Sequence, residues 1–421
     1  MNFFEYRDGE MHVENIKVSM IADKVGTPFY LYSSASLEYQ YNQFKDAFGD
    51  LDLLICYAVK ANTNQAVIKT LGSLGAGADV VSEGEMRRAI KAGISPQKIV
   101  YSGVAKTVAE MTYALKKGIF QFNVESEPEL YQLSEVATAL GKVADITFRV
   151  NPDVDAKTHA KISTGKSENK FGIPWKNIHQ ICAKAAKLSG IKLVGLDLHI
   201  GSQITDLAPF EEAFTRVGNL VETLREEGHD ITRLDLGGGI GISYDGENDN
   251  PILSHDYAKM VKRVVGHLQC QIIIEPGRFL VGNAGILVSK VVYVKEGAER
   301  SFLIIDAAMN DLIRPSMYDA YHAIDPVIEN KDAKVAYDIV GPVCETGDTF
   351  AKGRIINPLK KDQLIVIRSV GAYGAVMAST YNTRRLIPEV LVKTNEFAVV
   401  RPRPSYEDII GLDQLPSWLS E

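Results

Sequence analysis

The sequence predicts an α/β chain built as a (β/α)8 barrel of the TIM type followed by a C-terminal all-β domain. Eight short apolar runs, rich in β-branched residues, alternate with Ala/Lys/Glu-rich segments of helical periodicity between residues 53 and 275. Strands that alternate with helices pair in parallel, and eight such units over about 250 residues match the size of a closed barrel. Polar residues also end several of these runs, where a barrel gathers them around one mouth. An open, doubly wound sheet is the alternative architecture.

The eight expected strands are short and apolar, and together they place the barrel at residues 31–280. They are Leu53 to Val59, Ala78 to Ser82, Ile99 to Gly103, Phe120 to Val124, Ile146 to Val150, Leu193 to Ile200, Arg233 to Leu236 and Ile272 to Glu275.

Longer strand-like segments with few helices follow and predict the β domain at residues 281–421, with a final helical segment that returns toward the barrel. These segments are Ile286 to Tyr293, Ser301 to Asp306, Lys334 to Val340, Gln363 to Ile367 and Glu396 to Arg401. Residues 1–30 are also strand-like, and we expect them to join the β domain. The polar stretch Asn151 to Asn169 is the expected mobile loop.

Charge and composition exclude several classes of partner. The formal charge of -7 leaves no basic field for nucleic acid, so small anionic substrates must be held by individual arginines. No apolar run of 18 residues and no signal-like start occurs, so no membrane partner is expected and the expected location is cytoplasmic. The four cysteines lie far apart without C-x-x-C spacing, which indicates neither a disulfide framework nor a metal site.

Lys60 ends the first strand, in the run Tyr57 to Asn62. A lysine in this place lies at a pocket rim with a partly desolvated amine, the state in which it can form a Schiff base with a carbonyl cofactor. A solvated charge on a loop is the alternative. Similar signatures at three further strand ends favour the pocket.

The sixth and seventh strands end in groups suited to an aromatic, phosphorylated cofactor. His199 can stack on a planar ring and Ser202 offers a hydroxyl to a phosphate, although a satisfied structural histidine is the alternative. The glycine run Gly237 to Gly241 lets backbone N–H groups approach an anion closely. Because it matches neither G-x-G-x-x-G nor a Walker loop, a nucleotide-binding unit is not expected. A phosphate cradle and a plain tight turn both remain open.

The eighth strand ends in Glu275-Pro276-Gly277-Arg278. A carboxylate at a barrel mouth can hold a protonated pyridine nitrogen, and Arg278 can pair with a carboxylate or a phosphate. A salt-bridged turn is the alternative. Asp79 and Arg149 are secondary candidates at the rim, for which a structural role is equally open.

Taken in order, these motifs resemble those of the pyridoxal-phosphate decarboxylases of the alanine-racemase-like barrel class, and within it the diaminopimelate decarboxylases, over nearly the whole chain. The residues that carry the resemblance are Tyr57 to Asn62, His199 to Gln203, Gly237 to Gly241, Glu275 to Arg278, Met309 to Pro315 with Tyr318 to His322, Gly341 to Asp348, and Gly371 to Gly374. The last three groups lie in the β domain and separate this branch from general barrel relatives.

The resemblance implies pyridoxal 5'-phosphate as cofactor and a reaction that converts meso-2,6-diaminopimelate to L-lysine and CO2, the last step of lysine biosynthesis. It also implies which residues bind the cofactor and which bind the substrate. The implied cofactor-binding residues are Lys60 as the Schiff base, His199 on the ring, Glu275 at the pyridine nitrogen, and Ser202, Gly238, Gly277, Arg278 and Tyr373 around the phosphate. The implied substrate-binding residues are Arg278, Arg314, Tyr318 and Tyr373, with Glu345 for the distal ammonium.

The resemblance also makes Cys344 the proton donor and, with Lys60, a catalytic residue. A small buried hydrophobe is the alternative for any cysteine, but the neighbouring Glu345, Thr346 and Asp348 favour a polar loop. In the family these residues enter the site from the partner, which implies a homodimer with shared active sites. A related decarboxylase acting on a carboxylated diamine, or on a siderophore- or antibiotic-precursor amino acid, is the alternative function. A non-catalytic cofactor-binding homologue is a remote one.

Overall fold

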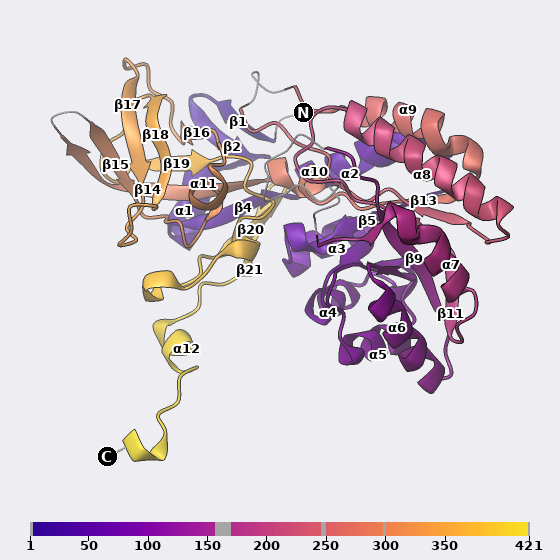
Figure 1. The fold of residues 1–421 in the computed structure, drawn as a ribbon. Helices are drawn as coiled ribbons and strands as arrows, with labels where there is room; N and C mark the ends of the chain where they lie inside the picture. Colours follow the sequence, from indigo (N-terminus) through magenta and orange to yellow (C-terminus); the bar gives the residue numbers. More distant parts are fainter. Residues whose placement is uncertain (1–2, 156–169, 246–249, 298–299, 420–421) are drawn as a thin grey trace. The chain divides into compact units, whose positions relative to one another are not determined.

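The computed structural model describes residues 3–155, 170–245, 250–297 and 300–419 (Figure 1). The chain divides into two compact units. The barrel unit comprises Leu37–Ser243 and Asp249–Val281, and the β unit comprises Met1–Ser36, Tyr244–Asn248 and Gly282–Glu421. Most of the expected mobile loop, residues 156–169, lies outside the described residues.

The barrel unit is a closed parallel barrel. β8 pairs with β9 and β13 pairs with β5, so the strand order returns to its start and the open-sheet alternative is excluded. Its strands are β5 (Leu53–Ala58), β6 (Gly77–Val80), β7 (Ile99–Tyr101), β8 (Gln121–Val124), β9 (Ala144–Asn151), β11 (Ile191–Asp197), β12 (Arg233–Asp235) and β13 (Gln271–Ile274). The short strand β10 (Ile173–Pro174) adds to β9. The prediction of a (β/α)8 barrel is confirmed.

Helices connect successive strands of the barrel, and α8 and α9 pack against each other (Figure 1). The helices are α2 (Ser34–Phe48), α3 (Gln65–Ser73), α4 (Glu83–Lys91), α5 (Val108–Lys117), α6 (Glu127–Ala139), α7 (Ile178–Ala185), α8 (Ala208–Glu226), α9 (Ser254–Val265) and the short α10 (Arg278–Val281). Local sequence explains where several begin. Ser82, Thr107 and Ser126 cap α4, α5 and α6, because each hydroxyl accepts an N–H of the first helical turn.

Some strands end earlier than the sequence indicates. The sixth was expected to reach Ile200, but β11 ends at Asp197. The Leu198 N–H still donates to the Asp235 carbonyl over 3.1 Å, and then the chain leaves the sheet. The apolar run therefore continues past the strand, and His199 lies in the loop that follows it.

The β unit is built on one large sheet. Its main path is β18-β17-β15-β14-β4-β20-β21, with β19 joining β14 and β16 joining β19. These strands are β4 (Phe29–Ser33), β14 (Gly285–Glu296), β15 (Ser301–Ile305), β16 (Ile324–Pro326), β17 (Val335–Val340), β18 (Thr349–Ile356), β19 (Leu364–Ile367), β20 (Glu389–Lys393) and β21 (Glu396–Arg401). The short helices α11 (Arg314–Tyr318) and α12 (Tyr406–Ile410) belong to the same unit. The sequence did not indicate β16, β18 or β20.

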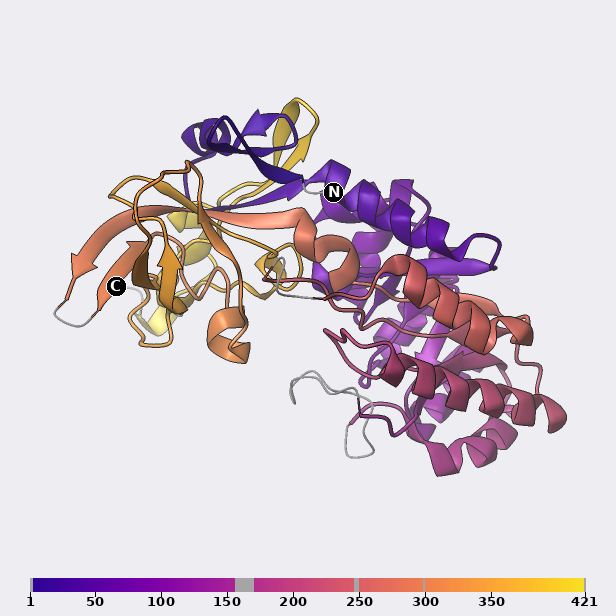
Figure 2. The same ribbon diagram turned by 90° about the horizontal axis from the view of Figure 1, so that it is seen from above.

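The first residues of the chain pack on this sheet. β1 (Phe4–Arg7), β2 (Glu10–Val13) and β3 (Ile16–Lys17) form a small antiparallel sheet that leads into α1 (Val18–Val25). Their apolar side chains share a buried core with residues of β4, β14, β19 and β20. Figure 2 shows the indigo N-terminal segment beside the yellow strands of the β unit. β4 itself lies between β14 and β20.

One short segment from between two barrel strands groups with the β unit. The sequence assigned all of residues 31–280 to the barrel, but Tyr244 packs edge-on against His322, with 5.1 Å between the ring centroids. The Arg314 guanidinium lies 4.8 Å from the centroid of the same Tyr244 ring. These aromatic and cation–π contacts explain the grouping.

The close packing of β11 against β12 leads to a first prediction about stability. A Cβ at Gly195 in β11 would lie 2.1 Å from the Arg233 carbonyl oxygen of β12, whereas one at Gly266 would meet nothing within 4 Å. We expect Gly195→Ala to lower the free energy of unfolding by about 1 to 3 kcal/mol, the usual range for overpacking. Gly266→Ala is the matched control and should stay within about 0.5 kcal/mol of wild type. Urea unfolding followed by circular dichroism measures both, and equal midpoints would contradict the packing argument.

Candidate active site

Lys60 lies at the carboxyl end of β5, on a single 3-10 turn. Its Nζ is 2.7 Å from Asp79 Oδ2, at the end of β6. The lysine side chain is 38% exposed, whereas that of Asp79 is fully buried. The amine is therefore reachable from outside while a buried carboxylate holds its position, which suits a group that reacts with a carbonyl compound.

Three carboxyl groups meet inside the barrel below this rim. Oxygen atoms of Asp197, Asp235 and Glu275 lie within 4.8 Å of one another, and all three residues are buried. Burial raises the pKa of the Glu275 carboxyl well above its usual range, and the nearby Asp235 and Asp79 raise it further. Burial is likewise the largest cause that raises the pKa of Asp235 to about 7. The cluster is thus short of positive charge.

Polar side chains from β8 fill the barrel beside this cluster. Asn123 Nδ2 donates to Glu275 Oε1 over 3.3 Å and to Asp235 Oδ2 over 3.4 Å. Gln121 Nε2 also donates to Asp235 Oδ2, over 3.2 Å. Asp197 Oδ1 is buried and has no hydrogen-bond partner within the described part of the chain. The amides thus orient Asp235 and Glu275 without neutralising them.

His199 is held as a neutral imidazole. The Gly238 N–H donates to its Nδ1 over 3.2 Å, so that nitrogen carries a lone pair. Burial lowers the pKa of His199 well below its usual value, and the positive charges of Arg149 and Lys60 lower it further. A neutral ring fixed by a backbone amide presents a flat face to an aromatic group without repelling a cation.

Packing requires the glycines at 237–239, and their loop has backbone N–H groups that could bind an anion. A Cβ at Gly237, Gly238 or Gly239 would lie 2.2 to 2.4 Å from a backbone carbonyl oxygen of a neighbouring segment. Only glycine therefore fits, as a tight turn requires. The N–H groups of Gly239 and Ile240 have no hydrogen-bond acceptor among the described residues. The tight turn and the anion cradle, which the sequence left as alternatives, are thus compatible in one loop.

Arg278 and Ser202 complete this side of the barrel. Arg278 Nη2 donates to Ser202 Oγ over 3.1 Å, and the arginine is only 7% exposed. Gly277 precedes α10, and its N–H has no acceptor among the residues described. A Cβ at Gly277 would press against Ala58 and Ala61, at 3.1 Å, which flank Lys60 in sequence.

Arg149, a secondary candidate at the barrel rim, makes structural contacts. Arg149 is buried, and its Nη1 donates to Glu125 Oε1 over 3.1 Å. Its guanidinium also lies 4.8 Å from the centroid of the Phe171 ring. Asp79, the other secondary candidate, is the partner of Lys60.

In the β unit, Arg314 is held in a fixed geometry at the start of α11. Its Nη1 lies 2.8 Å from His322 Nε2, and His322 Nδ1 lies 2.8 Å from the Arg368 carbonyl oxygen. The carbonyl can only accept, so Nδ1 carries the proton and Nε2 accepts from the arginine. Tyr318 follows four residues later on the same helix face.

Cys344 and Glu345 lie exposed on the loop between β17 and β18. The buried Asp348 holds this loop, because its carboxylate accepts the N–H groups of Met309 and Val343, each over 2.6 Å. Ser316 of α11 donates to the Gly347 carbonyl over 2.5 Å, which ties the loop to the helix that carries Arg314. The thiol is thus on a polar loop rather than in a core.

Tyr373 adopts a left-handed backbone conformation, with φ of 57°. A Cβ at Gly285 would lie 2.7 Å from the Cα atom of Gly371, two residues before Tyr373, and a Cβ at Gly374 would lie 2.9 Å from the Tyr30 ring. A tyrosine in this region of φ is uncommon and persists where the surroundings impose it.

The barrel portion matches the model of the pyridoxal-dependent decarboxylases, pyridoxal binding domain, over residues 34–282. A diaminopimelate decarboxylase of Zymomonas mobilis is 49% identical over 419 residues, which cover 99% of each chain. The chain belongs to the diaminopimelate decarboxylase family. The crystal structure of the Helicobacter pylori family member complexed with L-lysine is 42% identical, with a TM-score of 0.90 over 94% of this chain and 98% of that one. The M. jannaschii structure in co-complex with L-lysine is 36% identical, with a TM-score of 0.95 over 99% of both.

Membership of this family brings pyridoxal phosphate as the cofactor. The residues present fit it. A reachable amine stands at Lys60, unpaired N–H groups at Gly239, Ile240 and Gly277 can receive a phosphate, and Glu275 offers a buried carboxylate to a ring nitrogen that carries a proton. A protonated nitrogen would also supply the positive charge that the carboxyl cluster lacks.

Four residues have structural roles that the sequence did not indicate. His322 and Tyr244 fix Arg314, Asn123 orients Glu275, and Asp348 holds the loop of Cys344. Asp348 and His322 stand inside motifs of the resemblance, so their positions carried a signal. Asn123 and Tyr244 carried none, because their partners lie far along the chain.

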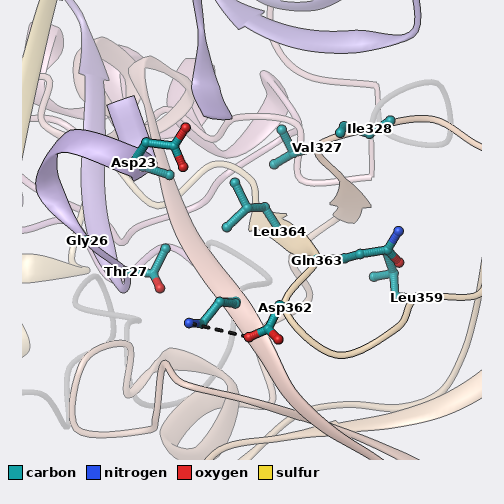
Figure 3. Close-up of a pocket in the computed structure, with 11 residues that line it drawn as sticks. Asp23, Gly26, Thr27, Val327, Ile328, Leu359, Asp362, Gln363 and Leu364 are labelled. Carbon is teal, nitrogen blue, oxygen red and sulfur yellow. Dashed lines mark ion pairs between the residues drawn. The ribbon is translucent and has the colours of Figure 1, made fainter. Parts of the chain in front are cut away.

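The β unit also contains a separate cavity of about 370 Å³ near the end of α1 (Figure 3). Lys290 and Asp362 face each other there across 3.6 Å, and Val327 and Leu364 form part of an apolar wall. Its one lysine is already paired with a carboxylate, and none of its lining residues is among the predicted site residues.

In the described part of the chain, no helix is both long and apolar enough to span a membrane.

The buried carboxyl cluster predicts a pH dependence. The pKa of Asp235 is about 7 in the fold and near 3.8 when unfolded, so the folded state binds more protons between these values. Asp235 therefore lowers the free energy of unfolding as pH rises from about 4 to about 7. We expect the stability of Asp235→Asn relative to wild type to increase over that interval, measured by urea unfolding of protein stripped of cofactor. The exposed Asp256→Asn is the control, and a pH-independent difference for Asp235→Asn would contradict the account.

Proposed function

We propose that this protein removes one carboxyl group of meso-2,6-diaminopimelate as CO2 and releases L-lysine. Its relatives over the full chain are diaminopimelate decarboxylases. The observation that carries the proposal for the substrate is the guanidinium of Arg314, buried, hydrogen-bonded to His322 and stacked on Tyr244. A guanidinium fixed in this way is suited to a carboxylate, and diaminopimelate has one beyond its reacting end.

Lys60 holds the cofactor through its amine, and Asp79 keeps that amine at the barrel mouth. Bound pyridoxal phosphate delocalises the electron pair left behind when CO2 departs. Glu275 keeps the ring nitrogen protonated, and Asn123 orients that carboxylate. His199 would lie against a face of the ring. The N–H groups of Gly238's loop and of Gly277, with Ser202, Arg278 and Tyr373, would hold the phosphate.

Substrate selectivity follows from the cost of leaving arginine side chains without a carboxylate partner. Arg278, Arg314 and Tyr318 bind the distal carboxylate, Tyr373 lines the same site, and Glu345 pairs with the distal ammonium. A substrate without the distal carboxylate leaves two guanidinium groups unpaired, at a cost of roughly 2 to 4 kcal/mol.

Cys344 returns a proton to the carbon that lost CO2. A thiol is a suitable donor, and its exposure on a polar loop supports this role. Because Cys344 and Glu345 are exposed in the single chain, we assign them to the active site of a second copy, in a homodimer with shared sites. We also assign the enzyme to the cytoplasm, where its four free cysteines stay reduced.

The proposal predicts a marked substrate preference. Purified, cofactor-loaded protein should release CO2 from meso-diaminopimelate and form lysine. The value of kcat/KM for L-lysine, L-ornithine or L-arginine should be lower by at least about thirtyfold, since two unpaired guanidinium groups cost roughly 2 kcal/mol or more. Release of CO2 is measured in parallel for each compound. A holoenzyme that leaves diaminopimelate intact would favour a related decarboxylase acting on another carboxylated diamine.

Shared sites predict recovery of activity in hybrid dimers. Lys60→Ala and Cys344→Ala should each be nearly inactive alone. A mixed dimer contains one site with both residues intact, so an equal mixture should regain about a quarter of wild-type activity. Subunit exchange is confirmed with differently tagged chains. Absence of recovery after confirmed exchange would indicate that each chain holds a complete site.

A further inference from the structure

Two neighbouring residues of the β unit adopt a backbone conformation that ordinary side chains avoid. Asn382 has φ of 56° and ψ of 26°, and Thr383 has φ of 53°. Asparagine tolerates this left-handed region, but a β-branched threonine in it is an outlier. Such a conformation persists only where the surrounding contacts impose it, and it gathers at functional sites.

The strained turn is anchored on both sides to one buried residue, Asn310. Asn310 Nδ2 donates to the Ser379 carbonyl over 3.0 Å, and the Ser379 N–H donates back to the Asn310 carbonyl over 2.9 Å. After the turn, Arg384 Nε donates to Asn310 Oδ1 over 2.9 Å, and its Nη2 donates to the Asp306 carbonyl over 2.7 Å. These contacts fix the chain before and after residues 381–383.

The turn directs two side chains at the loop that carries Cys344. Asn382 Oδ1 accepts the backbone N–H of Cys344 over 3.0 Å. The Tyr381 hydroxyl donates to the Glu345 carboxylate, which raises the pKa of the Tyr381 phenol. The left-handed backbone is thus the geometry that lets adjacent residues contact adjacent residues of the other loop.

Asp348 anchors the opposite side of that loop. It accepts N–H groups from Met309 and Val343, so the backbone is fixed just before Cys344 and three residues after Glu345. Cys344 and Glu345 are both exposed and lie between the anchor at Asp348 and the turn at Asn382. Without the turn, the part of the loop that bears the reactive groups would lose the contact to the Cys344 backbone.

We propose that Asn382 and Tyr381 are positioning residues that orient Cys344 for proton donation and Glu345 for binding of the substrate ammonium. The proposal rests on the proposed function, because it assigns a role to residues that act through Cys344 and Glu345. Asn382 sets the direction of the thiol through the Cys344 backbone, and Tyr381 sets the carboxylate. Strain in the turn is the consequence of holding both contacts at once.

Asn382→Gly is the decisive variant, because glycine relieves the strain and removes the hydrogen-bond acceptor. We expect its kcat for diaminopimelate to fall about tenfold or more, with KM changed less than about threefold, because a small displacement of a proton donor slows the step that needs it. The solvent deuterium isotope effect on kcat should increase, since proton delivery becomes slower. Asn382→Asp keeps an acceptor and should retain more of the activity than glycine.

Tyr381→Phe should act on the other contact and raise KM more than it lowers kcat, because Glu345 would lose its hydrogen bond. Asn330→Ala is the matched control: Asn330 also bonds to backbone groups of a loop in the β unit, and it contacts none of these residues. The control should leave kcat, KM and the isotope effect at wild-type values. Thermal midpoints of all variants identify any that fail to fold.

A measurement without substrate separates this proposal from the proposed function. The rate at which iodoacetamide alkylates Cys344 in the holoenzyme, followed by peptide mass, should change by about threefold or more in Asn382→Gly and stay constant in Asn330→Ala. A wild-type protein that leaves diaminopimelate intact would defeat the proposed function alone. A folded Asn382→Gly enzyme with wild-type kcat, isotope effect and alkylation rate would overturn the positioning role.

Discussion

Burial of negative charge inside a closed barrel is the constraint on which the active site depends. The carboxyl groups of Asp197, Asp235 and Glu275 lie together where water has little access, with Lys60 and Arg149 as the nearby cations. The ring nitrogen of bound pyridoxal phosphate, once protonated, would supply the missing positive charge, so the electrostatics that make the cluster costly without the cofactor would favour its binding. His199 is neutral in the same surroundings, because burial and the positive charges of Arg149 and Lys60 lower its pKa.

Close packing imposes the second requirement. The glycines at 237–239 fit only because a Cβ would strike neighbouring carbonyl groups, and the same loop leaves amides unpaired at its tip. One packing requirement thus also leaves backbone amides that would suit an anion. A phosphate held by these amides would need no lysine, so Lys60 would be the group that binds the aldehyde.

The barrel and its mouth could be predicted because their signals are local. Each strand is a short apolar run, and Lys60, His199 and Glu275 stand directly after such runs. The β unit was harder to predict. β20 pairs with β4 from the start of the chain, and the apolar pattern of β18 is interrupted by Lys352, Gly353 and Arg354. Two further residues carried no local signal. Asn382 contacts Cys344, which is 38 positions away in the sequence, and Tyr244 belongs to the β unit although its sequence neighbours on one side belong to the barrel unit. Residues that hold functional groups in place emerge only when the chain is folded.

Attachment of the cofactor at Lys60 is the central claim, and borohydride reduction tests it most directly. Sodium borohydride is added to the purified, cofactor-loaded protein, and the site of the resulting pyridoxyl group is found by peptide mass mapping. The account predicts the label on Lys60 of the peptide that follows β5, and loss of the label in Lys60→Ala. A pyridoxyl group on another lysine, or a label that persists in the variant, would contradict it.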